Sequence, residues 1–228
     1  MPEALEASVG IGVIHLFCTV GEGTDRAAIG VALKAAQADD LQVVPVAVLG
    51  HKADVAFMVL GKDWWKLKSF QTALSVAGLT IIDSYVSMTE LSEYAKGLPE
   101  QMAKARLYPE LPPEGMSAWC FYPMSKKRER KANWFTLPFD ERKELMMEHG
   151  ASGRKFAGRI VQLITGSAGV DDYEWGVTLF AQKPDDLKEV VYTMRFDEAS
   201  AKYADFGPFI TGAIGTLAEV LDAAGVPD

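Results

Sequence analysis

The chain has 228 residues, of which 49% are hydrophobic and 24% charged, with a formal net charge of -8 at pH 7. This composition is typical of a folded globular protein, and the negative charge argues against general binding to nucleic acid or anionic membranes. No apolar run approaches the ~18 residues of a membrane-spanning helix, and the start of the chain lacks the pattern of a secretion signal. Cys18 and Cys120 each lie in an apolar, strand-like segment, which indicates reduced thiols. These features predict a soluble cytoplasmic protein.

Strand and helix signals alternate regularly in the first half of the chain. Strands are predicted over 11–20, 41–50, 53–61 and 80–88, from their apolar and β-branched composition. One predicted helix begins at a cap at Thr24 or Asp25 and extends to Gln37, and a second covers 62–78. The order β-α-β-β-α-β is that of a ferredoxin-like unit.

The second half repeats this order. Strands are predicted over 117–124, 159–166, 173–181 and 206–213, and helices over 138–150, 184–196 and 214–224. Two four-stranded antiparallel sheets can pack together through the faces that their helices leave open. The predicted fold is α+β, with tandem ferredoxin-like repeats that form a dimeric α/β barrel within one subunit.

A stretch rich in glutamate, proline and small residues, 89–116, connects the halves, with a short helix predicted near Leu91–Ala95. The predicted domain division is an N-terminal half over 1–100, a linker over 101–116 and a ligand-binding C-terminal half over 117–228.

Histidine is scarce, with three in the chain. His15 lies within a predicted strand and His51 at a predicted turn, which favours a buried and a solvated side chain, respectively. His149 is predicted to end the helix over 138–150, with Leu145 and Met146 on the same face. It can interact with the last helix carbonyls, or it can be the single ligand of a porphyrin iron. No HExxH, CxxC, GxGxxG or P-loop motif occurs, so zinc and dinucleotide sites are not predicted.

The segment CFYPMSKKRERKANW (120–134) combines a tyrosine with a run of cations. Tyr122 ends a predicted strand, and Pro123 is expected to turn the chain so that Lys126 can reach back toward the phenol. Arg106 adds a cation upstream. A phenol beside cations could bind a carboxylate, and a local basic patch on an acidic protein suits a small anionic ligand. Alternatively, Tyr122 is a half-buried strand residue and the cations form a solvated loop.

Six segments together resemble the coproheme decarboxylases of the chlorite dismutase family, in the type found in Gram-positive Firmicutes. They are RLYPELP (106–112), CFYPMSKKR (120–128), NWF (133–135), ERKELMMEHGASGRKFAG (141–158), QLITGSAGVDDYEWGVTLF (162–180) and MRFDEASAKY (194–203). The first half is matched mainly by SYVSMTELSEY (84–94). The resemblance implies two ferredoxin-like halves, assembly as a homopentamer and a porphyrin site in the C-terminal half.

The resemblance also implies roles for individual residues. His149 matches the axial ligand of the heme iron, Tyr122 the catalytic tyrosine that becomes a radical, and Lys126 the catalytic lysine beside the reacting propionate. The matching substrate-binding positions are Arg106, Tyr122, Pro123, Met124, Ser125, Lys126, Gln162 and Ser200. Gln162 stands where chlorite dismutases carry an arginine, which favours decarboxylation over chlorite chemistry. Tyr85 is matched less closely, and its role stays open.

The implied activity is that of a coproheme decarboxylase, the last step of coproporphyrin-dependent heme biosynthesis. Fe-coproporphyrin III would become protoheme (heme b) by two hydrogen peroxide-dependent decarboxylations, at propionates 2 and 4, through a tyrosyl radical. Coproheme would be both substrate and redox cofactor, and peroxide the oxidant. A transient contact with the iron-inserting ferrochelatase is also implied. The alternatives are a chlorite dismutase or heme peroxidase, and a non-enzymatic heme carrier or sensor.

Overall fold

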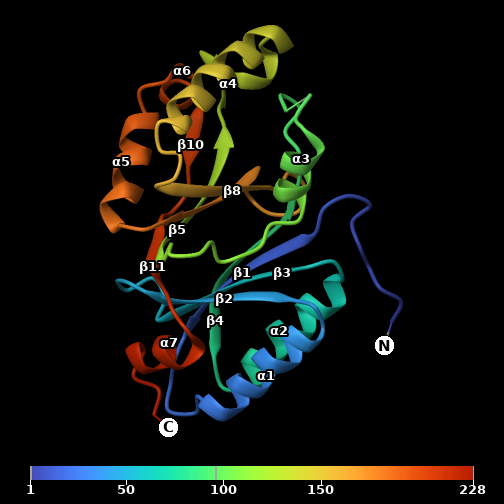
Figure 1. The fold of residues 1–228 in the computed structure, drawn as a ribbon, viewed down its shortest axis with the longest axis vertical. Helices are drawn as coiled ribbons and strands as arrows, with labels where there is room; N and C mark the ends of the chain where they lie inside the picture. Colours follow the sequence, from blue (N-terminus) through green and yellow to red (C-terminus); the bar gives the residue numbers. More distant parts are fainter. Residues whose placement is uncertain (1, 96, 228) are drawn as a thin grey trace.

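The computed structural model of the chain describes residues 2–95 and 97–227 (Figure 1). Residues 1, 96 and 228, which fall within the predicted domain ranges, lie outside the described residues. The first half contains β1 (Gly12–Thr19), α1 (Arg26–Ala38), β2 (Gln42–Val48), β3 (Val55–Gly61), α2 (Trp64–Val76) and β4 (Thr80–Thr89). Asp25 caps α1 by accepting a hydrogen bond from the amide of Ala28, and Asp63 caps α2 in the same way from Trp65. The predicted order of the first half is confirmed.

The second half contains the remaining elements. They are α3 (Glu100–Leu107), β5 (Ala118–Lys126), β6 (Arg128–Glu129), β7 (Ala132–Asn133), a 3₁₀ turn (Trp134–Thr136), α4 (Phe139–Arg154), β8 (Ile160–Gly166), β9 (Trp175–Ala181), α5 (Pro184–Met194), α6 (Glu198–Ala201), β10 (Ala204–Phe206), β11 (Ile210–Ile214) and α7 (Leu217–Ala223). The short helix predicted at Leu91–Ala95 is wrong, since the connecting stretch forms α3 instead. The predicted last strand is divided into β10 and β11 around Pro208.

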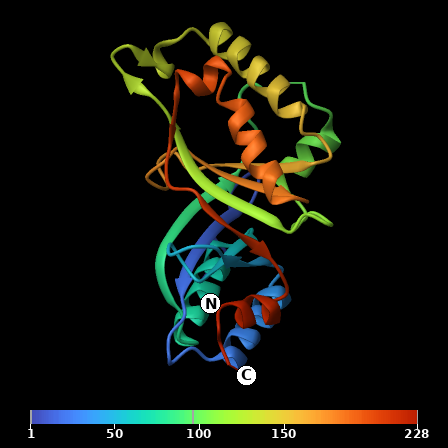
Figure 2. The same cartoon turned by 90° about the vertical axis from the view of Figure 1, so that its left-hand side faces the viewer.

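The strands of both halves join into one barrel (Figure 2). In the described part of the chain the strand order is β10-β5-β11-β2-β3-β1-β4-β8-β9, and β5 also pairs with β9. Eight strands therefore close into a ring. The ninth strand, β10, lies outside this ring and pairs with the end of β5. The halves are joined where β11 pairs with β2 and where β4 pairs with β8, both antiparallel. The predicted tandem ferredoxin-like barrel is confirmed.

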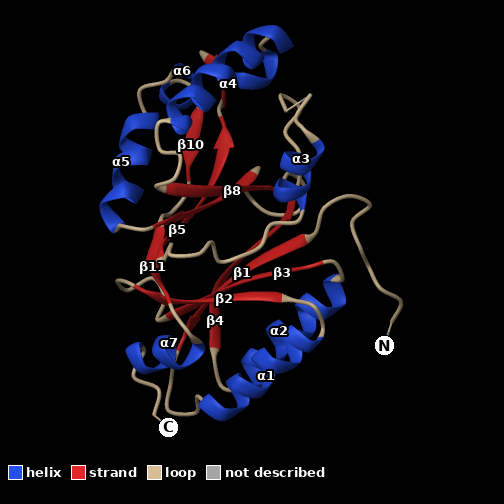
Figure 3. Cartoon of the chain, viewed as in Figure 1, coloured by secondary structure: helices blue, strands red, loops and turns tan. Residues whose placement is uncertain are grey.

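Helices cover the outside of the barrel (Figure 3). One core lies between the strands of the first half and α1, α2 and α7, and another lies between the strands of the second half and α5. A third core fills the barrel interior and includes Phe17, Trp119 and Phe121. Because side chains alternate along β5, Cys120 and Tyr122 point away from the barrel interior, to the side that the helices cover. The last helix, α7, packs on the first half, while the domain division itself stays a prediction.

The strand β5 does not turn at Pro123, contrary to the sequence-based expectation. Pro123 pairs with Gly176 of β9 and lies between the residues of β5 that pair with β11 and those that pair with β10. Its carbonyl accepts a hydrogen bond from the amide of Gly207, so the N–H that proline lacks would point into the same interval between β10 and β11. Proline is tolerated in a strand where no ladder bond is lost. The strand therefore continues to Lys126.

Among the described residues, no helix is long and apolar enough to span a membrane.

Candidate functional site

His149 lies within α4, because that helix continues to Arg154 and does not end at Gly150 as predicted. The imidazole of His149 therefore contacts other side chains and not the last carbonyls of the helix. The imidazole Nδ1 lies 3.1 and 3.2 Å from the two carboxylate oxygens of Asp197 and 3.3 Å from Oγ of Ser200. The imidazole is partly exposed, whereas the Asp197 side chain is 1% exposed.

Asp197 is held in its ionised form. Burial acts to raise its pKa, but the hydrogen bond and charge of His149 and the bonds from Ser200 outweigh burial, and the pKa is lowered. Asp197 also caps α6 by accepting a hydrogen bond from the amide of Ser200 at 2.9 Å. A buried carboxylate at Nδ1 favours the tautomer with the proton on Nδ1, which leaves the Nε2 lone pair for a metal.

The surroundings of His149 leave apolar surface uncovered. None of the residues of α4 is buried, and the helix contacts mainly α5 and α6. Leu145 and Met146, which share a face of this helix with His149, are only half-buried. Ile164 of β8 is 44% exposed and lies on the same sheet face as Tyr122. Apolar side chains that a fold leaves partly uncovered are found at ligand-binding surfaces.

A bare metal ion has no ready-made site here. Among the described residues, no group of three or more His, Cys, Asp or Glu side chains could hold one. A metal at His149 would have to bring its other ligands with it, as the iron of a porphyrin does. The single imidazole, its buried carboxylate and the uncovered apolar surface fit such a group.

Tyr122 is buried among rings and not among cations. Its ring stacks on Phe209 at a centroid distance of 4.4 Å and meets Phe206 edge-on at 5.7 Å. The pKa of Tyr122 is raised above its ordinary value, mainly by burial and to a smaller extent by the nearby Cys120 thiol. A close ammonium or guanidinium group would lower it instead. The phenol is therefore neutral at physiological pH and retains its hydrogen.

Lys126 does not reach back toward Tyr122, so that expectation is wrong. The two residues lie on the same face of an extended strand, with Cα atoms about 13 Å apart from the rise of four residues. The ammonium of Lys126 donates to the carbonyl of Ala199 at 2.7 Å and lies 4.5 Å from the centroid of the Trp134 ring. Burial lowers the pKa of Lys126 to about 8, against the opposing charges of Asp197 and Glu174. At pH 7 the side chain is mostly protonated.

The strand register places Gln162 on the same side of the sheet as Tyr122. Gln162 pairs with Leu179 of β9, which pairs with Cys120 of β5. Gln162 on β8 and Tyr122 on β5 are thus separated by two strand spacings and by an offset of two residues along the strand. Standard strand dimensions put their Cα atoms about 12 Å apart. Gln162 is exposed, so its side chain is accessible to a ligand.

The other predicted site residues lie in varied surroundings. Arg106 is exposed in the last turn of α3, and Ser200 is 8% exposed beside His149. Pro123, Met124 and Ser125 form the end of β5 beside Lys126. The binding roles of all these residues stay predictions.

Tyr85 lies on the other side of β5 from Tyr122. It is 4% exposed in the barrel interior, 5.3 Å from the ring of Phe121 between centroids, and its hydroxyl contacts that of Ser167. Burial raises the pKa of Tyr85 to about 12, while the bond to Ser167 opposes the rise and nearby acidic groups add to it.

Asp197 and Glu174 were missed as site residues by the sequence-based analysis. Both lie within segments that carry the resemblance, but neither belongs to a recognisable local motif. Asp197 precedes a helix of only four residues and meets His149 across 48 positions of the chain. Such a contact depends on the tertiary fold, so no local pattern could have indicated it.

Comparison with known proteins adds to this geometry. A family model described as "Chlorite dismutase" matches residues 25–215. The chain belongs to the chlorite dismutase family. The resemblance predicted from the sequence is confirmed.

Relatives of this chlorite dismutase family member include a coproheme decarboxylase from Staphylococcus carnosus (strain TM300). It is 49% identical over 179 residues, which cover 73% of this chain and 70% of the relative. A solved structure of a heme-binding protein from Thermus thermophilus is 34% identical, with a TM-score of 0.84 over 98% of this chain and 97% of the other. A mutant chlorite dismutase from Candidatus Nitrospira defluvii has a TM-score of 0.75 over 96% and 97% of the two chains, but at 18% identity it supports the fold alone.

Proposed function

We propose that this chain is a coproheme decarboxylase that converts Fe-coproporphyrin III to protoheme with hydrogen peroxide as the oxidant. The observation that carries the proposal is the position of His149, whose Nδ1 is held by a buried carboxylate and whose Nε2 is left for iron. The 49% identity to a coproheme decarboxylase gives the proposal its substrate.

His149 would be the iron ligand, and the half-buried Leu145 and Met146 on the same helix face would contact the macrocycle. Arg106, Gln162 and the end of β5 would meet its edges. The bound iron porphyrin supplies the oxidising power of peroxide, which protein side chains lack. Asp197 keeps the proton of His149 on Nδ1 and makes the imidazole a stronger electron donor.

Tyr122 would carry the oxidising equivalent as a tyrosyl radical. Its buried, neutral phenol can lose an electron and a proton together and then take a hydrogen atom from the β-carbon of a propionate. Loss of a second electron and of carbon dioxide leaves a vinyl group. For each propionate, one peroxide and one proton are consumed and two waters form, so the electrons balance. The reaction would occur twice, at propionates 2 and 4.

Lys126 would hold a substrate carboxylate. An ammonium has three N–H groups, so the bond to Ala199 leaves donors for a ligand. A charge-assisted bond to a carboxylate is stronger than the neutral bond to a carbonyl, and a partly buried site strengthens it further.

The experiment that tests the proposal follows the porphyrin by mass spectrometry. Coproheme bound to the purified protein is titrated with peroxide, and two successive losses of one carbon dioxide and two hydrogen atoms are expected. Loss of colour without these products would indicate a heme carrier or sensor. Oxygen release on addition of chlorite would indicate a chlorite dismutase. That outcome is disfavoured because position 162 carries a glutamine and not an arginine.

The family resemblance also supports a proposal about assembly. The chain would form a homopentamer and receive coproheme through a transient contact with ferrochelatase. Sedimentation velocity of the purified protein tests the first part, and transfer rates in the presence of ferrochelatase test the second.

A further inference from the structure

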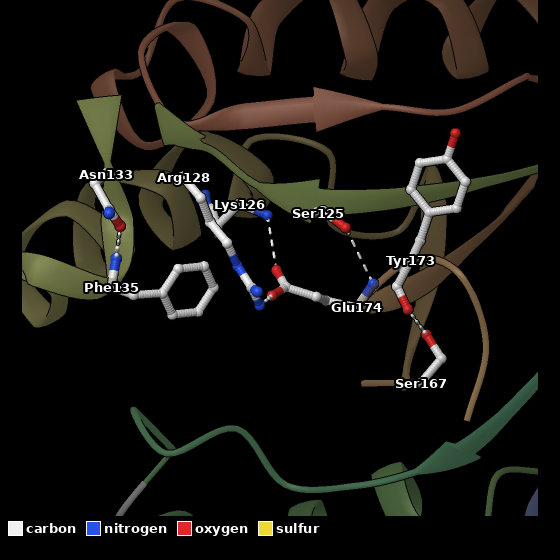
Figure 4. A network of polar contacts seen from close by, with 8 residues as sticks. All are labelled: Ser125, Lys126, Arg128, Asn133, Phe135, Ser167, Tyr173 and Glu174. Carbon is white, nitrogen blue, oxygen red and sulfur yellow. Dashed lines mark hydrogen bonds and ion pairs between the residues drawn. The ribbon is translucent and has the colours of Figure 1, made fainter. Parts of the chain in front are cut away.

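Glu174 connects three parts of the second half through one buried carboxylate (Figure 4). Its side chain is 11% exposed. One carboxylate oxygen accepts from the backbone amide of Lys126 at 2.9 Å, and the other accepts from the guanidinium of Arg128 at 2.6 Å. Its own amide donates to Oγ of Ser125 at 3.2 Å. The end of β5, the hairpin β6–β7 and the loop before β9 are therefore tied to one residue.

The hairpin gains a second fixed contact through Arg128. The guanidinium carbon lies 4.6 Å from the centroid of the Phe135 ring, and the amide of Phe135 donates to Asn133 at 3.1 Å. Arg128 is 70% exposed, so its ion pair alone would be weak in water. Its partner is mostly buried, which strengthens the pair and fixes the side chain over the ring.

Lys126 is thus held at both ends. Its backbone amide donates a hydrogen bond to Glu174. Its ammonium donates to the carbonyl of Ala199 and lies over the ring of Trp134. A side chain that bridges two fixed points cannot sample its usual range of rotamers. Pre-ordering of this kind lowers the entropy that a ligand must overcome when it binds.

We propose that Glu174 is a positioning residue for Lys126: it holds the main chain of Lys126 and the basic hairpin in one arrangement and places a negative charge at the Lys126 backbone. What Lys126 binds rests on the proposed function, but the positioning does not. Glu174 need not touch the substrate, because it acts through Lys126.

The charges around Lys126 give this proposal a distinctive signature. A cavity of about 420 Å³ beside Lys126 is lined by the charged residues Lys127, Arg128, Glu129, Asp172, Glu174 and Asp205, and Asp197 acts on the ammonium from the start of α6. Among these, Asp197 and Glu174 favour the protonated form of Lys126. Removal of the Glu174 charge should therefore make the ammonium easier to deprotonate.

The experiment titrates Lys126 in the ligand-free, full-length protein by NMR of ¹³C-labelled lysine, with Lys126→Arg used for assignment. Glu174→Gln keeps the shape and one hydrogen-bond acceptor but removes the charge. Arg128→Gln leaves the carboxylate in place and removes its neutralising partner. Glu129→Gln is the matched control, because Glu129 is exposed on the same hairpin and lines the same cavity.

We expect Glu174→Gln to shift the Lys126 titration to lower pH, Arg128→Gln to leave it unchanged or shift it to higher pH, and Glu129→Gln to have no effect. The affinity of Glu174→Gln for coproheme should fall by about twofold relative to the wild type at pH 8, and by less at pH 6.5, for a shift of about half a pH unit. A shift to lower pH in both Glu174→Gln and Arg128→Gln would mean that the ion pair merely stabilises the hairpin, and it would overturn the proposal. The same titration in Glu174→Gln and Glu129→Gln would also overturn it. A wild-type protein that titrates as expected but does not bind coproheme would contradict the proposed function alone.

Discussion

Asp197 accepts a hydrogen bond from Nδ1 of His149 at 3.1 Å, although its side chain is 1% exposed and is needed to cap α6. One buried carboxylate thus fixes both a short helix and the tautomer of the imidazole. The same helix offers the carbonyl of Ala199 to Lys126. The proposed iron ligand and the proposed carboxylate anchor are therefore both held by contacts with one four-residue helix and its cap.

Asp197→Asn tests the role of this carboxylate. Asparagine can still cap α6, so the fold should be retained, but it no longer favours the proton on Nδ1. We expect the affinity for coproheme to fall about 10- to 100-fold, as is typical when a residue that orients a metal ligand is changed. The titration is followed by absorbance, with Asp185→Asn at an exposed position in the first turn of α5 as the control. Equal affinities of Asp197→Asn and the wild type would show that the carboxylate serves α6 alone.

Tyr122→Phe separates binding from chemistry. Phenylalanine retains the stacking on Phe209 and loses only the hydroxyl, so both folding and coproheme affinity should stay close to those of the wild type. Without the phenol, peroxide should yield no vinyl product, which mass spectrometry of the extracted porphyrin measures. Tyr192→Phe, at an exposed position of α5, should react normally. Normal product formation by Tyr122→Phe would rule out the radical role.

The fold could be predicted from the sequence because its elements carry local signals. Asp25 and Asp63 mark helix starts, and apolar runs such as those of β1 and β3 mark strands that are buried on both faces. The pairing of β11 with β2 had no such signal, because it depends on how the two halves meet.

The site was predicted less completely, for physical reasons. Pro123 suggested a turn, but its missing N–H falls between two partner strands and β5 continues. Gly150 suggested a helix end, but α4 continues to Arg154. Both errors follow from the use of local propensity where tertiary contacts decide the backbone. The contacts of Asp197 and Glu174 were beyond any local pattern, since each joins segments more than 40 positions apart.

The charge of Lys126 predicts how coproheme affinity depends on pH. Burial lowers the pKa of Lys126 to about 8, so the ammonium is present below that pH and is lost as the pH rises through it. The substrate carboxylates remain ionised throughout this range. Affinity should therefore fall between about pH 7 and 9, as measured by titration of coproheme at each pH.

Two variants at this position check the origin of that change. Lys126→Arg keeps its charge at every pH used, so its affinity should not fall in this window. Lys126→Met has no charge to lose, and its affinity should be weak and nearly independent of pH. A wild-type decline that persists in Lys126→Met would assign the pH dependence to another group.

His15 predicts how the stability of the barrel depends on pH. It is 1% exposed, its Nε2 lies 3.0 Å from Oγ1 of Thr178 across the barrel, and burial lowers its pKa from 6.5 to about 3. Below pH 6.5 the His15 imidazole is protonated in the unfolded chain but stays neutral in the folded protein. The free energy of unfolding therefore falls as the pH falls. Between pH 7 and 5 this group should remove about 2 kcal/mol of stability, and the loss should continue toward pH 3.

Denaturant unfolding at several pH values measures this dependence. His15→Gln should show a shallower decline, whatever its absolute stability, while His51→Gln at an exposed turn should decline like the wild type. If His15→Gln and the wild type lost stability in parallel, the acid sensitivity would have to come from the carboxylates, of which Asp197 is the first to consider because its pKa is lowered in the folded state.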